Sequence, residues 1–162
     1  MPGGTAARGR WAWVSEHTAA RKPRVLVLGL DGATFDLLDV WMERGLMPNV
    51  QRLTAEGSRA VLRSVMPPVT APAWTSFATG VRPGRHGVFD FRRRQTGQLA
   101  RRFISSRDVK APAFWDILAD AGLQTGLINV PVTYPLSERT SFAISDMLTP
   151  STDVQFTNPP TL

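Results

Sequence analysis

The chain has 162 residues, 43% of them hydrophobic, which is enough to bury the core of one ordinary domain and argues against a disordered chain. It contains no cysteine, which excludes disulfides and thiolate metal sites. No apolar run approaches the roughly 18 residues of a membrane-spanning helix, and the N-terminus lacks the apolar block of a secretory signal. We therefore expect a cytoplasmic chain with no membrane partner.

Positive charge is unevenly distributed along the chain. The formal net charge is +6, from 19 basic and 13 acidic side chains. Residues 82–110 alone carry nine basic side chains against Asp90 and Asp108, so this segment has a net charge of 9 − 2 = +7. Such a segment attracts phosphates or nucleic acid, although a solvated, arginine-rich loop has the same composition.

The first third of the chain predicts a leader, a strand and two helices. Residues 1–23 show no sustained period and are expected to form a flexible basic leader. RVLVLGL at 24–30 is a short β-branched run, typical of a strand buried on both faces of a parallel sheet. Helices are expected over 34–44 and 48–56, with Thr34 as a cap and glycines after both segments.

The remainder predicts an alternation of strands and helices. The expected elements are an edge strand over 58–65, a helix from Pro72 to Thr79, an irregular segment over 81–110, a helix over 112–121, strands over 124–130 and 141–145, and a loop-like tail over 151–162. This order predicts an α/β fold with a mostly parallel sheet and helices on both of its faces.

Two positions are candidates for a catalytic or ligand-binding role. Asp31 follows the expected strand over 24–30, and ligands of open α/β sheets bind beyond the carboxyl ends of strands. Thr70 lies near the start of the next helix, where unpaired N–H groups stabilise anions. Each has an ordinary structural alternative, because Asp31 could form a turn and Thr70 could be a helix cap.

Several ordered motifs resemble the alkaline phosphatase superfamily, and in particular its type I phosphodiesterase/nucleotide pyrophosphatase branch with bacterial phosphohydrolase and phosphomutase relatives. The motifs are LGLDG at 28–32, LMPNVQRLTAEG at 46–57, PPVTAPAWTSFATGVRPGRHGVFDF at 67–91, SSRDVKAPAFWDIL at 105–118 and GLINVPVTYP at 126–135. The resemblance covers about residues 24–150, which we expect to be the N-terminal part of such a domain.

The resemblance implies a metal-dependent phosphoric ester hydrolase. It makes Asp31 a metal ligand, and Thr70 both the nucleophile and a metal contact, at a site with two divalent ions, zinc or manganese. The substrate would be a phosphate ester. His86 matches a motif position that is not a usual metal ligand, so we expect it to be structural. Phe91 stands where nucleotide pyrophosphatases carry an asparagine that holds a phosphate oxygen.

Other metal ligands of the family lie in Asp-x-x-x-His and Asp-His motifs, which do not occur in this chain. We therefore expect these 162 residues to be inactive by themselves. The alternatives are a non-catalytic remnant that binds anions through its basic loop, and a nucleic-acid binder. The second would use Arg92, Arg93, Arg94, Arg101 and Arg102, with Phe89, Phe91 and Phe103 to stack bases. No nucleic-acid-binding signature accompanies them, so no nucleic-acid partner is expected. The oligomeric state is not predicted.

Overall fold

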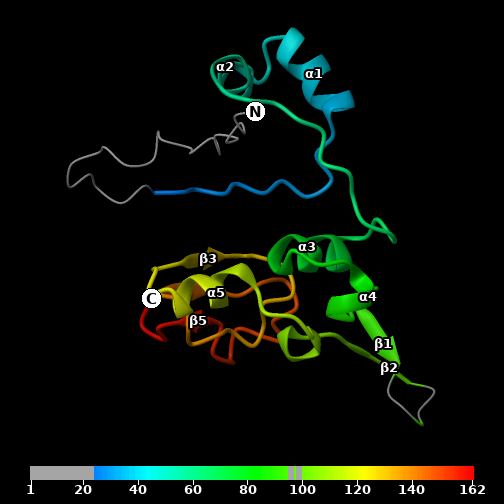
Figure 1. The fold of residues 1–162 in the computed structure, drawn as a ribbon, viewed down its shortest axis with the longest axis vertical. Coiled ribbons are helices and arrows are strands. Elements are labelled where there is room, and N and C mark those ends of the chain that lie inside the picture. The colour runs from blue at the N-terminus through cyan, green and yellow to red at the C-terminus, as the bar shows by residue number, and fades with distance from the viewer. Residues whose placement is uncertain (1–23, 95–96, 98–99) are drawn as a thin grey trace, which may run out of the picture.

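The computed structural model describes residues 24–94, 97 and 100–162 (Figure 1). The expected leader over residues 1–23 lies outside the described residues. Within the described ranges, no helix combines the length and the hydropathy needed to cross a membrane.

The two helices expected in the first third are present and pack on each other. Helix α1 spans Phe35–Glu43 and helix α2 spans Pro48–Glu56. Thr34 begins α1 as predicted, because its hydroxyl accepts the Asp36 backbone N–H at 3.4 Å. Met42 is the buried contact between the helices, while the outer faces of both remain exposed.

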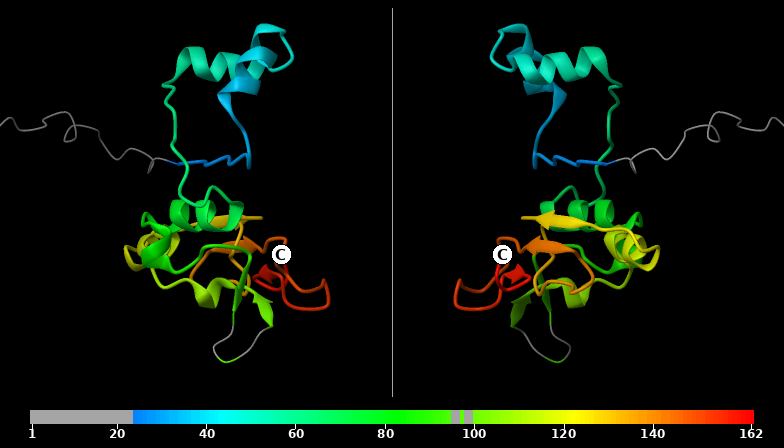
Figure 2. Two further views of the ribbon diagram at one scale, coloured as in Figure 1. Left: turned by 90° about the vertical axis from the view of Figure 1, so that its right-hand side faces the viewer. Right: turned by 90° about the vertical axis from the view of Figure 1, so that its left-hand side faces the viewer.

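The predicted strands over 24–30 and 58–65 are wrong for the described chain. Both segments are extended, but neither forms a ladder with another strand. Their apolar side chains are in water, with Leu26 90% and Leu62 89% exposed. Figure 2 shows the segment over 24–30 leading into α1, and the segment over 58–65 connecting α2 to α3 and the rest of the molecule. An apolar run becomes a buried strand only when neighbouring strands satisfy its backbone, and no described segment does so here.

The remaining helices and strands form a compact body. Its elements are α3 (Thr70–Thr79), α4 (Pro83–His86), β1 (Arg92–Arg94), β2 (Arg101–Phe103), the 3₁₀ turn η2 (Ser106–Asp108), α5 (Phe114–Asp120), β3 (Gly126–Ile128), β4 (Phe142–Ile144) and β5 (Thr157–Asn158). The segment expected to be irregular thus contains an antiparallel hairpin, β1–β2. The expected loop-like tail supplies a strand, β5.

The sheet character is mixed. Strand β3 runs parallel to β4, and β4 pairs with β5 in antiparallel orientation, so the strand order is β3-β4-β5. The described chain therefore has an α/β composition with two small sheets. The predicted larger parallel sheet with helices on both faces appears only as the single β3–β4 pair.

Helix α3 organises the core, because it supplies residues to both buried clusters. Ala78 packs with Trp115 of α5 and Leu127 of β3, and Ala71 packs with Val88 near the start of the hairpin. The sequence pattern predicts Phe114, Ile117 and Leu118 as the inner face of α5. Phe114 does pack against the core, but the most buried residue of α5 is Trp115, at 8% exposure, and Ile117 is 55% exposed.

Candidate active site

The N-terminus of α3 is set by its local sequence. Val69 is extended, with φ −115° and ψ 149°, and Thr70 is the first helical residue. Pro72 suits the first turn because it has no N–H that would need a partner there. Gly80 ends the helix in the left-handed conformation, with φ 66°. The Thr70 hydroxyl therefore lies at the positive end of a helix of ten residues.

The structure brings the two predicted site residues together. Asp31 ends the extended segment and enters a turn in which Gly32 has a φ of 68°. The Thr70 Oγ1–H donates a hydrogen bond to Asp31 Oδ2 at 3.0 Å, across 39 positions of sequence. Asp31 is exposed and Thr70 is half-buried, so the pair lies at the surface of the molecule.

A third residue, Trp74, completes the contact and is absent from the predicted site. Its indole Nε1–H donates to Asp31 Oδ1 at 3.2 Å, so the carboxylate accepts one hydrogen bond on each oxygen. Trp74 follows Thr70 by four residues, and residues at this spacing lie on the same face of a helix. That spacing is the sequence signal that could have identified it.

The Trp74 ring also lies directly on Gly29, two residues before Asp31. A Cβ added at Gly29 would lie 2.1 Å from the Trp74 ring, far inside van der Waals contact. Glycine at this position thus allows the extended segment to approach α3 closely enough for Asp31 to reach Thr70.

We predict that Gly29→Ala separates the segment over 24–31 from α3. The added methyl group must displace the indole, which breaks the Trp74–Asp31 hydrogen bond. Hydrogen exchange in residues 24–31 should accelerate at least several-fold, while exchange in α5 stays unchanged. The matched control is Gly84→Ala in α4, where an added Cβ meets nothing within 4 Å. Equal exchange in the Gly29→Ala variant and the wild type would contradict the contact.

His86 has the structural role expected from its motif. It is fully buried, and its Nδ1 accepts the Val88 backbone N–H at 3.1 Å. Because Nδ1 is an acceptor, the neutral ring carries its proton on Nε2, which lies 2.8 Å from Ser76 Oγ. Burial lowers the pKa of His86. The imidazole is therefore neutral at pH 7, and both nitrogens are already engaged within the protein.

The described residues do not form a metal site by themselves. Asp31 and Thr70 offer two converging oxygen donors, which is the right chemistry for a divalent cation. However, the described part of the chain contains no group of three or more His, Cys, Asp or Glu residues that could hold an ion. Since a zinc site uses about four ligands, these residues do not form a complete site for the expected metals.

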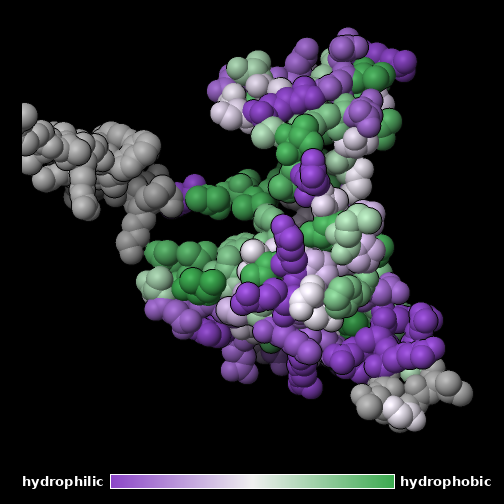
Figure 3. All heavy atoms as spheres, turned by 45° about the vertical axis from the view of Figure 1, so that its right-hand side comes forward, coloured by the Kyte–Doolittle hydropathy of each residue, from purple (hydrophilic) through white to green (hydrophobic). Residues whose placement is uncertain are grey.

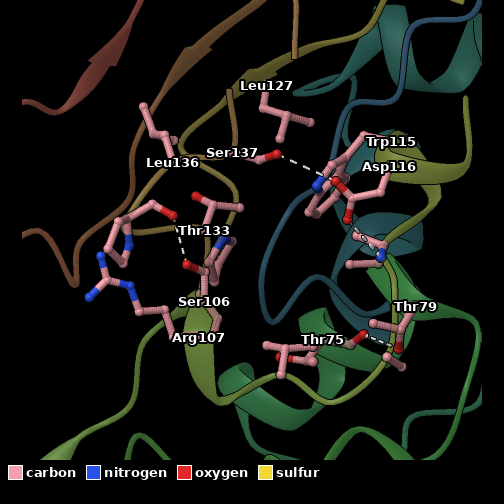
Figure 4. A pocket seen from close by; sticks show the side chains of 17 residues that line it. Thr75, Thr79, Ser106, Arg107, Trp115, Asp116, Leu127, Thr133, Leu136 and Ser137 are labelled. Atoms are coloured by element: carbon pink, nitrogen blue, oxygen red, sulfur yellow. Dashed lines mark hydrogen bonds between the residues drawn. The ribbon is translucent and has the colours of Figure 1, made fainter. Parts of the chain in front are cut away.

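A separate pocket of about 370 Å³ lies on another side of α3 and does not include Asp31 or Thr70 (Figure 4). Thr75 and Thr79 line it, together with Ser106 and parts of α5, β3 and the loop after β3. Its hydroxyls are occupied, since Thr79 donates to the Thr75 carbonyl at 2.7 Å and Ser106 to the Pro135 carbonyl at 2.6 Å. The pocket and the Thr70–Asp31 pair are thus different places.

Comparison with known proteins agrees with the motifs and the geometry. The sequence model of the type I phosphodiesterase / nucleotide pyrophosphatase family matches residues 25–159. The chain belongs to this family. The predicted site residues, Asp31 and Thr70, both lie within the matched range.

The curated relatives of this phosphodiesterase-family chain are distant and much longer. Ectonucleotide pyrophosphatase/phosphodiesterase family member 3 from Bos taurus, Mus musculus and Rattus norvegicus is 26% identical to it over 119 residues. The alignment covers 67% of this chain and 13% of each relative, so the chain corresponds to a small part of their length. No solved structure matches the chain.

Proposed function

We propose that this chain carries the nucleophile-bearing part of a metal-dependent phosphoric ester hydrolase. The observation that carries the proposal is the 3.0 Å hydrogen bond from Thr70 to Asp31 at the N-terminus of α3. In this role Thr70 attacks phosphorus and Asp31 is a ligand of a divalent metal, zinc or manganese. Membership of the type I phosphodiesterase / nucleotide pyrophosphatase family supports a phosphate ester or nucleotide as the substrate class.

The proposed reaction has two displacements. The Thr70 oxygen forms a bond to phosphorus while the bond between phosphorus and the leaving oxygen breaks, and the hydroxyl proton is lost to a base. Water then attacks the phosphothreonine, which releases phosphate, or a phosphate monoester if the substrate is a diester, and restores the hydroxyl. The unpaired N–H groups at the start of α3 stabilise negative charge on the phosphoryl oxygens in both steps.

Asp31 and Trp74 have positioning roles in this proposal. The Asp31 carboxylate fixes the Thr70 hydroxyl, and Trp74 fixes the carboxylate by its own hydrogen bond. A bound metal would supply charge that favours the alkoxide form of the threonine. The described residues hold no complete ligand set, so in this proposal the further ligands are supplied by residues outside the described ranges.

We predict that the purified 162-residue chain does not hydrolyse phosphate esters by itself. The assay is release of nitrophenol from p-nitrophenyl phosphate and from its bis-ester, with zinc or manganese and with a chelator. The expected rate equals the rate without protein, because two oxygen donors do not retain a catalytic metal. Metal-dependent turnover that is lost in a Thr70→Ala variant would show that the chain is a complete enzyme.

A second experiment, in which activity is expected, joins this chain to polypeptide that bears the Asp-x-x-x-His and Asp-His ligands. If the DNA after the coding region encodes these motifs, the two parts are expressed as one chain, here called the completed domain. We expect metal-dependent hydrolysis from the completed domain. Absence of hydrolysis in a folded, metal-loaded completed domain would contradict the proposed function and favour a non-catalytic remnant.

A further inference from the structure

The β1–β2 hairpin divides the arginines of the basic segment between two faces. Its register pairs Arg92 with Phe103, Arg93 with Arg102, and Arg94 with Arg101. Directly opposite residues share one face of an antiparallel ladder, and successive pairs alternate between the faces. The middle pair therefore lies on one face, called here the inner face. The other two pairs lie on the opposite, outer face.

Both arginines of the inner face pair with a single carboxylate of the protein, Asp108. Arg93 donates to Asp108 Oδ1 at 2.8 Å, and Arg102 binds both oxygens of the same carboxylate, at 2.5 and 2.8 Å. Asp108 is buried, at 7% exposure. These two arginines therefore tie the hairpin to the body, and each is already engaged by Asp108.

The outer face remains cationic. Its arginines, Arg92, Arg94 and Arg101, are all exposed, and no carboxylate in the described part of the chain forms an ion pair with them. Arg94 and Arg101 lie directly opposite each other, an arrangement in which like charges destabilise a strand pair. A bound anion would remove this repulsion. Figure 3 shows the strongly hydrophilic surface at this end of the molecule.

An aromatic ring lies among these charges. The Arg92 guanidinium lies over the Phe103 ring, 4.7 Å from its centroid, and Phe103 is 56% exposed. Guanidinium groups bind phosphate through two parallel hydrogen bonds and stack on flat rings, which ammonium groups do not. Arginine beside an exposed aromatic ring therefore matches a ligand that contains both phosphate and a planar base.

We propose that the outer face of the β1–β2 hairpin binds single-stranded nucleic acid. Arg94 and Arg101 hold the phosphodiester backbone, and a base stacks against Phe103 beside Arg92. The sequence contains no signature of a nucleic-acid-binding fold, and the proposal rests on the strand register, which leaves three arginines and one aromatic ring together. It is independent of the hydrolase function, because none of these residues belongs to the Thr70–Asp31 site.

The test is fluorescence anisotropy of a labelled oligothymidine with the full chain at several salt concentrations. One variant removes the outer face, with Arg92, Arg94 and Arg101 changed to Gln. The matched control removes three exposed arginines elsewhere, with Arg44, Arg52 and Arg63 changed to Gln. The first variant should lose at least about 10-fold in affinity near 0.1 M salt, and its salt slope should fall by roughly 2. The control should change affinity less than about 3-fold.

A second variant tests stacking apart from charge. Phe103→Leu should weaken binding about 5-fold or more and leave the salt slope unchanged, because the slope reports only phosphate contacts. Thermal melts followed by circular dichroism check that each variant folds. If the triple variant unfolds, the Arg94→Gln/Arg101→Gln pair, which keeps the Arg92–Phe103 contact, is measured instead and should still lose several-fold.

Three outcomes would overturn the proposal. Equal weakening in the outer-face and control variants would mean that net charge alone attracts the oligonucleotide. Binding to heparin or to anionic phospholipid vesicles as tight as to oligothymidine, with no effect of Phe103→Leu, would identify a general polyanion or membrane surface. The third is the absence of any measurable binding at low salt.

Discussion

Replacing Thr70 with alanine should abolish phosphoester hydrolysis by the completed domain, with a loss in kcat of roughly 10⁴-fold or more. The reason is that the proposed mechanism forms a covalent bond through the Thr70 oxygen, which alanine lacks. Thr70→Ser keeps the hydroxyl and the helix position, so it should retain activity within about 10-fold of the wild type. The measurement is steady-state hydrolysis of a nitrophenyl ester with a saturating divalent metal.

The control for this loss lies on the same helix. Thr79 has a hydroxyl that bonds only to the Thr75 carbonyl, at 2.7 Å, so Thr79→Ala should leave kcat nearly unchanged. An acid quench during turnover, followed by mass spectrometry, should find phosphate on the peptide that contains Thr70. Full activity of Thr70→Ala, or phosphate on a different peptide, would rule out this nucleophile.

Asp108→Asn should lower the free energy of unfolding by about 2 kcal/mol. The Asp108 carboxylate accepts hydrogen bonds from Arg93, Arg102 and the Ser105 backbone N–H. Asparagine turns an NH₂ group toward one of these donors and leaves the arginines without a counter-charge. Arg93 and Arg102 are 45% and 40% exposed, and solvent screening keeps the loss below that of a fully buried pair.

The same variant should also change how the free energy of unfolding depends on pH in the acid range. Hydrogen bonds from Arg102 hold the pKa of Asp108 well below its usual range. The folded state therefore binds this proton less readily than the unfolded state does. The stabilisation is present above the ordinary aspartate pKa of about 3.9 and is lost as the pH falls below it. The difference between wild type and Asp108→Asn should thus shrink between pH 7 and about pH 2.5.

Urea denaturation at the two pH values measures both effects. The matched control is Asp120→Asn, which breaks the exposed ion pair with Arg139 and should cost less than about 0.5 kcal/mol. If Asp108→Asn costs no more than Asp120→Asn at pH 7, the Asp108 cluster does not hold the hairpin. Circular dichroism of the folded baseline shows whether the hairpin remains.

Local sequence was enough to predict the longer helices and to mark Asp31 and Thr70, each separately, as candidate site residues. Thr34 begins α1 and Gly80 ends α3 through interactions within a few residues, which a sequence displays directly. The two short apolar runs at 124–130 and 141–145 likewise predicted the strands β3 and β4, though not their pairing. The pairing of Asp31 with Thr70, across 39 positions, was accessible only through the resemblance of their motifs to a family.

The tertiary structure decided everything that depends on a distant partner. The run over 24–30 has the composition of a buried strand, yet it stays exposed because no described segment pairs with its backbone. Likewise, composition shows that the basic segment is rich in arginine, but only the tertiary structure shows which arginines pair with Asp108 and which have no such partner among the described residues. Capping and periodicity act over a few residues and can be read along the chain. Strand pairing and burial of charge join residues far apart in sequence, and only the folded arrangement determines them.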